Sequence, residues 1–200
     1  MKMKNLILAG TFAAAMATPQ AMANTLQITG GSTQVELTSF DALTSLGLSV
    51  SIFGTAKLDA SGPFPVASFL VTGGTVDSAT GFASIEHDGS GLGLSNGTDS
   101  VELANFLVDT ESLLLSGDVS VNGSFVANLD LFSITSSLEL LLTAGAADAL
   151  NGVYGTALPE GLSIGFATPN VTTVPVPAAL PLFASALAGL GFARSRKRAA

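Results

Sequence analysis

The side chain best suited to acid–base chemistry is His87, because it is the only histidine of the 200-residue chain. A nucleophile–histidine–acid arrangement would have to use this imidazole. Its neighbours Glu86 and Asp88 would point to the opposite side of a strand from the ring. We therefore predict that His87 faces solvent in a turn and that the protein is not an enzyme.

Ligands for a metal ion are also sparse. Zinc sites usually combine several histidines or cysteines, and the chain has one histidine and no cysteine. Calcium takes carboxylate and carbonyl oxygens, which the segments 88–91 and 96–99 carry, but Asp and Asn beside Gly are also ordinary turn residues. No pair of carboxylates stands out as a glycosidase would require. We assign no metal or cofactor, and calcium stays an open alternative.

The charges of the chain are unevenly distributed. All 15 acidic residues lie between Glu36 and Glu160, whereas six of the seven basic residues lie near the two ends. With the ends set aside, Lys57 is the one base, and the net charge is 1 − 15 = −14. Such a segment cannot neutralise phosphate, which excludes nucleic acid as a partner. The absence of tryptophan and the single tyrosine also disfavour a sugar site built on aromatic stacking.

The N-terminus has the parts of a secretory signal peptide. Lys2 and Lys4 form a basic start, and an apolar run follows from Leu6 to Ala17. Ala21 and Ala23 then form the small-x-small pattern that signal peptidase cleaves. We therefore predict that the chain is exported.

The C-terminus carries a second targeting pattern. A Val-Pro-x-Pro-Ala motif opens an uncharged stretch of 20 residues, Val174 to Ala193, about the length that a helix needs to cross a bilayer. The basic cluster behind it would stay on the cytoplasmic side. The motif residues are Val174, Pro175, Pro177 and Ala178, and the basic cluster is Arg194, Arg196, Lys197 and Arg198.

This tail resembles the PEP-CTERM sorting signal of Gram-negative bacteria, with Val176 where the better-known form has glutamate. The resemblance implies that an exosortase, a membrane protease-transpeptidase, processes the tail, and that the helix holds the chain in the inner membrane until then. It also implies a place in the cell envelope or extracellular matrix, with biofilm formation as the setting and exopolysaccharide as a candidate partner. An ordinary single-pass anchor is the alternative.

A second resemblance concerns residues 142–154, which are similar to the closing stretch of secreted haem-uptake domains of the HtaA type. Those domains bind haem through a tyrosine. Tyr154 is the only tyrosine of the chain, and no earlier tyrosine matches a ligand position. The resemblance implies an alternative function, a haem-like small-ligand binding module of the cell surface.

The segments that must position these groups have mostly the pattern of β-strands. Apolar residues alternate with polar ones around residues 34–38, 46–52, 138–142 and 162–166, which is typical of half-buried strands. We expect a two-residue turn at Asn96-Gly97 and a three-residue loop at 122–124, and we interpret the nine phenylalanines of the middle region as core. The Ala-rich residues 144–150 predict one short helix, and residues 40–46 are a candidate for another turn of helix.

These patterns together predict three parts. Residues 1–23 are the signal peptide, residues 24–173 an acidic all-β domain, and residues 174–200 the sorting signal with its hydrophobic helix and basic tail. The domain is a single antiparallel sandwich or barrel with one short helix. The predicted function is that of an exported structural protein of the surface or exopolysaccharide matrix, with the haem-like binding module as the alternative.

Overall fold

The computed structural model describes residues 25–175. Their strands and helices follow one another along the chain as β1 (Thr25–Glu36), α1 (Phe40–Ser45), β2 (Ser49–Gly54), β3 (Lys57–Asp59), β4 (Val66–Leu70), β5 (Gly73–Asp77), β6 (Ala83–Ser95), β7 (Ser100–Asp109), β8 (Leu114–Val121), β9 (Ser124–Ile134), β10 (Glu139–Leu142), α2 (Ala144–Tyr154) and β11 (Ser163–Pro175). The prediction of a single antiparallel all-β domain is confirmed.

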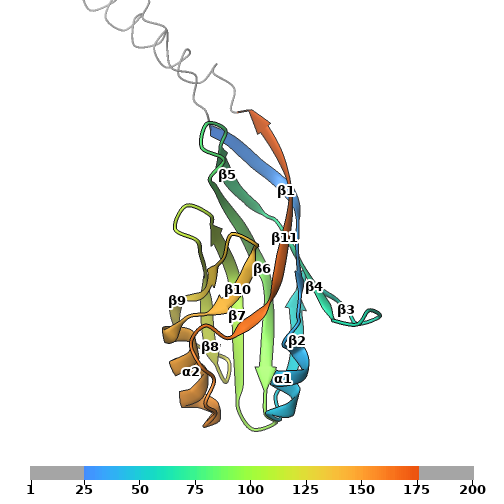
Figure 1. The fold of residues 1–200 in the computed structure, drawn as a ribbon, viewed down its shortest axis with the longest axis vertical. Helices are drawn as coiled ribbons and strands as arrows, with labels where there is room; N and C mark the ends of the chain where they lie inside the picture. The colour runs from blue at the N-terminus through green and yellow to red at the C-terminus, as the bar shows by residue number, and fades with distance from the viewer. Residues whose placement is uncertain (1–24, 176–200) are drawn as a thin grey trace, which may run out of the picture.

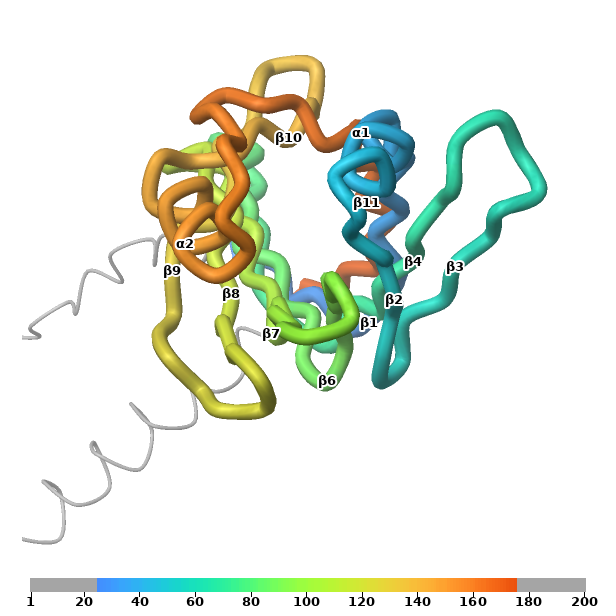
Figure 2. Tube along the Cα trace, turned by 90° about the horizontal axis from the view of Figure 1, so that it is seen from below, coloured from blue at the N-terminus to red at the C-terminus, as the bar shows by residue number. Residues whose placement is uncertain are grey.

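The strands form one sheet that returns to its start. Neighbours pair in the order β11-β10-β9-β8-β7-β6-β5-β1, and β1 also pairs with β11, so the sheet is closed. β4 and β3 continue from β1, and β2 pairs with β6. Figure 1 shows the β3–β4 hairpin projecting from one side, and Figure 2 shows the strands following one another around a ring. Both helices lie at the same end of the molecule.

The two ends of the described chain lie together at the opposite end (Figure 1). β1 and β11 are antiparallel, with Leu26 opposite Pro175 and Gln27 opposite Val174. The first two residues of the predicted sorting motif, Val174 and Pro175, therefore form the last residues of β11.

The two tested hairpins depart from their predicted turns. At Asn96-Gly97 the strands end at the pair Ser95–Ser100, so the loop has four residues, and Asn96 Oδ1 accepts the amides of residues 98 and 99 at 2.9 and 2.7 Å. The Asn96 side chain thus takes the place of a backbone acceptor inside the loop. The prediction of a two-residue turn was wrong for this reason. The apolar faces still match, because the register moves by two residues.

At Asn122-Gly123 the predicted three-residue loop was wrong as well. Val121 pairs with Ser124, which leaves a two-residue turn with Asn122 and Gly123 at φ +51° and +76°. A bulge follows between Val119 and Ser120 and restores the expected opposition of Val119 and Ala127. A bulge shifts the register within a strand, so the turn chemistry and the core pattern are both satisfied.

Both predicted helical segments are confirmed. The side chain of Thr143 caps α2 by accepting the amide of Ala146 at 3.2 Å, and the helix continues past the expected stop at Asn151-Gly152 to Tyr154. Gly155 then ends it in the left-handed conformation, φ +65°. No helix within residues 25–175 is long and apolar enough to cross a membrane; the predicted C-terminal helix lies outside these residues.

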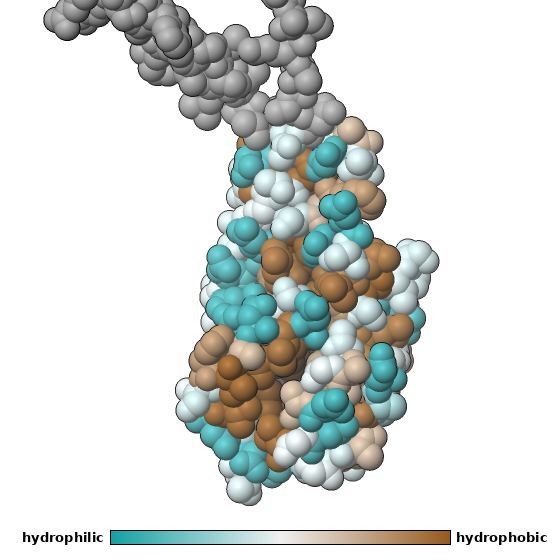
Figure 3. Space-filling view, turned by 90° about the vertical axis from the view of Figure 1, so that its left-hand side faces the viewer, coloured by the Kyte–Doolittle hydropathy of each residue, from teal (hydrophilic) through white to brown (hydrophobic). Residues whose placement is uncertain are grey.

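The core lines the inside of the closed sheet and is mainly aliphatic. Of the nine phenylalanines expected there, Phe69 and Phe106 are buried and meet edge-to-face with ring centroids 5.2 Å apart. Four others are exposed, so the prediction that all nine are core was wrong for Phe64, Phe82, Phe125 and Phe166. Figure 3 shows apolar side chains gathered on the lower half of the face that bears β9 and α2.

Candidate functional site

A cavity of about 110 Å³ lies inside the closed sheet. Strands from all sides line it, together with both helices, through side chains such as Val35 of β1, Phe69 of β4 and Leu140 of β10. Of its described lining residues, all are apolar except Thr33, His87 and Thr110. Cavities with apolar walls hold apolar molecules in preference to ordered water. The space is therefore suited to a hydrophobic ligand.

Strand alternation places these walls. In β1, residues 33 and 35 are buried while residues 34 and 36 are exposed, and in β10 Leu140 and Leu142 are buried on either side of Leu141. β11 departs from the predicted alternation: Ile164 and Ala167 line the cavity, and Phe166 is exposed. The shift occurs at Gly165, where a Cβ would overlap the carbonyl oxygen of Glu36. The glycine allows the β1 backbone to approach.

His87 lies in the wall of the cavity and is only 2% exposed. The prediction of a solvent-facing turn histidine was wrong, because β6 continues through this segment and alternation turns Ile85 and His87 inward. Glu86 and Asp88 are exposed, as the same alternation predicted. No carboxylate bonds to the ring among the described residues, so the geometry offers no nucleophile–histidine–acid arrangement.

Both ring nitrogens of His87 have partners. Nδ1 lies 3.2 Å from the carbonyl oxygen of Phe106, and Nε2 lies 2.7 Å from the hydroxyl of Thr33. A carbonyl can only accept, so Nδ1 carries the proton and donates it, and Nε2 accepts from the Thr33 hydroxyl. Burial lowers the pKa of His87, because desolvation disfavours the imidazolium. The ring is therefore neutral and held in one tautomer.

A bulge in β6 sets the position of this histidine. The register with β7 shifts between His87 and Gly91, and the buried Ser90 hydroxyl donates to the His87 carbonyl at 3.1 Å. A Cβ on Gly91 would overlap the ring of Phe53 and the carbonyl oxygen of Leu103. Position 91 of β6, at the end of the bulge, therefore requires glycine, because a side chain there would collide with these two residues. The sequence carried one sign of this burial, since Ile85 stands two residues before His87 and so on the same face of a strand.

Tyr154 is not part of the cavity wall. Its hydroxyl donates to the carbonyl oxygen of Leu94 at 2.6 Å and ties the end of α2 to β6. Partial burial raises the pKa of the phenol. The structure therefore does not bring Tyr154 and His87 into one site, although each is the only residue of its type.

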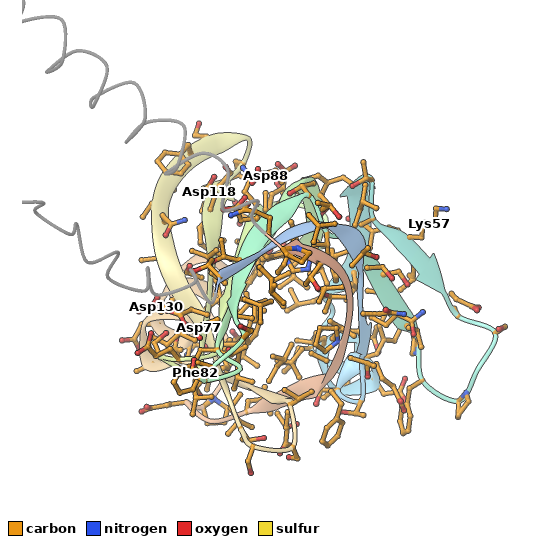
Figure 4. All side chains as sticks on the ribbon, turned by 90° about the horizontal axis from the view of Figure 1, so that it is seen from above. Lys57, Asp77, Phe82, Asp88, Asp118 and Asp130 are labelled. Atoms are coloured by element: carbon orange, nitrogen blue, oxygen red, sulfur yellow. The ribbon has the colours of Figure 1, made fainter. Side chains whose placement is uncertain are left out.

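The carboxylates are dispersed over the exterior. Within residues 25–175, no group of three His, Cys, Asp or Glu side chains is placed to hold a metal ion. Hydrogen bonds from Asn128 and Asn105, at 2.9 Å each, lower the pKa of Asp118. Figure 4 places Lys57 on the projecting hairpin, away from Asp118 and Asp130. The acidic surface is thus a solvated exterior, separate from the cavity.

The predicted processing residues fall largely outside the described part of the chain. Val174 and Pro175 belong to β11. The remaining ones lie beyond residues 25–175: Ala21, Ala23, Pro177, Ala178, Arg194, Arg196, Lys197 and Arg198.

Comparison with known proteins identifies two similar solved structures. The C-terminal domain of HtaA from Corynebacterium glutamicum superposes with a TM-score of 0.56 over 74% of this chain and 99% of that domain. The haem binding protein HtaB from the same organism superposes with a TM-score of 0.51 over 75% of this chain and 96% of that protein. This chain shares their fold. Identity is 14% in both cases, so the likeness extends to the fold alone. No protein-family profile and no curated protein sequence matches the chain.

Proposed function

We propose that the domain binds a small apolar ligand in the cavity of the closed sheet, and that haem is the ligand to test first. The observation that carries the proposal is an apolar cavity with one buried imidazole in its wall. Ligand sites in proteins are typically apolar hollows with a few polar groups. The shared fold supports haem as the first candidate, since one of the two similar structures is a haem binding protein.

The lining residues fit the apolar ring of a haem-like ligand. Within residues 25–175 there is no cysteine or methionine, and Lys57 lies on the outside. His87 is the one lining side chain with a nitrogen, and both of its ring nitrogens already have hydrogen-bond partners in the wall. Bound haem would supply an iron centre with an open coordination position. The apolar walls would exclude water from it, and the Phe106 carbonyl of β7 and the Thr33 hydroxyl of β1 would hold the imidazole.

A titration of the purified domain, residues 24–175, with haem tests the proposal. We expect the Soret band of haem to shift and sharpen and to saturate at one haem per chain. The variant Ala167→Phe, which places a ring inside the cavity, should lose this change. The control Ala79→Phe adds the same ring to the exposed turn after β5 and should bind as the wild type does.

Two outcomes would overturn the proposal. One is a spectrum of free haem at all protein concentrations. The other is equal binding by the Ala167→Phe and wild-type domains, because haem would then lie outside the cavity. Circular dichroism of each variant shows that the fold is retained.

We also propose export of the domain to the cell envelope, with processing of its tail by an exosortase. The signal-peptide pattern of residues 1–23 and the motif, apolar stretch and basic cluster of residues 174–200 support this arrangement. Fractionation of cells with and without residues 176–200 tests it. Mature surface protein that still carries Arg194 to Arg198 would contradict processing. A structural role in the exopolysaccharide matrix stays a prediction of the sequence, and no described feature favours it over ligand binding.

A further inference from the structure

We propose that the cavity takes a single unbranched alkyl chain with an uncharged head group, the chemistry of a neutral lipid. This inference rests on the proposal that the cavity is a ligand site, and it names the class of ligand. It starts from the three polar side chains of the lining, Thr33, His87 and Thr110, because any hydrogen bond from a lining side chain to a buried ligand would come from them.

The hydrogen-bonding groups of these side chains are already used within the wall. The Thr33 hydroxyl lies 2.7 Å from Nε2 of His87, and Nδ1 donates to the Phe106 carbonyl at 3.2 Å. The Thr110 hydroxyl accepts the Ala83 amide at 2.7 Å and donates to the Ala83 carbonyl at 3.2 Å. Among the described residues, no buried side-chain nitrogen or oxygen lacks a partner. A buried polar group of a ligand would find no side-chain partner here, which is unfavourable, so the buried part of the ligand is hydrocarbon.

The cavity is long for its volume. On β7 its lining extends from Leu103 to Thr110, which is about 20 Å of strand at about 3.4 Å per residue. The volume is about 110 Å³, and an apolar cavity of about 150 Å³ holds a molecule the size of benzene. One lipid chain spans half of a bilayer core, about 15 Å. The apolar walls suit a macrocycle and a chain alike, but a macrocycle would have to move the walls apart and a chain would not.

The surroundings of the cavity favour an uncharged head group. Leu138, in the turn between β9 and β10, lines the cavity and is 38% exposed, so a head group there would reach solvent. Its neighbour Glu139 lies opposite the exposed Phe166 of β11. The one base of residues 25–175, Lys57, lies on the projecting β3–β4 hairpin (Figure 4). A carboxylate head group would therefore meet a like charge and no cation.

Three ligands with the same number of carbon atoms test the chain, its width and its charge: decanol, cyclodecanol and decanoate. Isothermal titration calorimetry of the purified domain, residues 24–175, should show one decanol per chain, with the negative heat-capacity change of apolar burial. Cyclodecanol should bind about tenfold more weakly or less, because the broader ring overpacks the walls. Decanoate should bind up to about fivefold more weakly, because its charge lies near Glu139 at an exposed position.

Two pairs of variants locate the chain and its head group. Ala167→Phe places a ring inside the cavity and should abolish decanol binding, and Ala79→Phe in the exposed turn after β5 should not. Glu139→Lys should strengthen decanoate binding by up to about fivefold and leave decanol binding unchanged. Glu102→Lys makes the same charge change on the exposed outer face of β7 and should have little effect on either ligand.

The outcomes separate this inference from the proposed function. Failure of the wild type to bind haem, decanol or cyclodecanol overturns both. Haem binding that Ala167→Phe abolishes, without binding of decanol, overturns the inference alone. Cyclodecanol binding as tight as that of decanol, or tighter binding of decanoate than of decanol, also overturns the inference. These comparisons use the wild-type domain, so they decide the matter even where Ala167→Phe fails to fold.

Discussion

Lowering the pH from about 7.5 to about 5.5 should destabilise the ligand-free domain by up to about 1.4 kcal/mol through His87 alone. Burial holds the pKa of the native imidazole below its ordinary value of 6.5. The unfolded chain therefore binds a proton between these two pKa values that the native state does not bind. Stability that depends on the neutral ring is complete above pH 6.5 and is lost as the pH falls toward the native pKa.

The magnitude follows from one proton. One pKa unit corresponds to about 1.4 kcal/mol of free energy. A pH of 5.5 lies about one unit below the pKa of the unfolded imidazole. A native state whose His87 ring is still neutral at that pH therefore loses the full 1.4 kcal/mol or about that much. The carboxylates act in a separate window. The pKa values of Asp109 and Asp118 are lowered from 3.8 by hydrogen bonds, so their contribution is lost only below about pH 4.

Urea unfolding followed by circular dichroism at several pH values between these limits measures the effect. Because the chain has one histidine, a single control variant is enough to assign the pH dependence of the unfolding free energy to His87. The double variant Thr33→Val/His87→Leu removes the titrating group together with its hydroxyl partner and should give a free energy of unfolding that is flat over the same range. The reasoning is refuted if the wild type is equally flat, or if the double variant keeps the wild-type slope.

The remaining predictions concern packing and charge, and the first three are measured by urea unfolding. Gly91→Ala should destabilise the domain by about 1–3 kcal/mol, because its Cβ would overlap the ring of Phe53; Gly152→Ala, where no atom lies within 4 Å, should stabilise α2 by about 0.5–1 kcal/mol. Thr143→Ala removes the cap of α2 and should cost about 1 kcal/mol, whereas Thr143→Ser should cost little. Tyr154→Phe loses the bond to the β6 backbone and should cost about 1 kcal/mol; equal stability of variant and wild type would contradict each of these. Because the domain has a net charge of −14, added salt should strengthen binding of anionic metal-free protoporphyrin and leave that of its neutral dimethyl ester unchanged.

The alternation of apolar and polar residues was sufficient to predict the fold class. Period two requires only that one face of each strand is buried, which is a local property of residues 34–38 or 138–142. The start of α2 was equally local, because Thr143 caps the helix with its own side chain. Its end was not: the helix passes Asn151, whose side chain accepts the Leu158 amide at 2.7 Å and donates to the Leu158 carbonyl at 2.9 Å.

The hairpins show where local rules compete. Turn chemistry favoured a two-residue turn at Asn122-Gly123, and the core pattern favoured a longer loop, so the sequence left a conflict between them. The structure satisfies both with a bulge at Val119 and Ser120. Bulges depend on which strand lies opposite, and that is a property of the whole sheet.

The sequence by itself determined that the domain is acidic, cysteine-free and built of strands, and that its chemistry rests on one histidine and one tyrosine. The tertiary structure alone decided the roles of those two residues. Closure of the sheet through β1 and β11 creates an inside, and the alternation of side chains in β6 turns His87 into it beside Thr33. Contacts between residues 54 positions apart leave no trace in local patterning, because the burial of one polar side chain depends on which strands surround it.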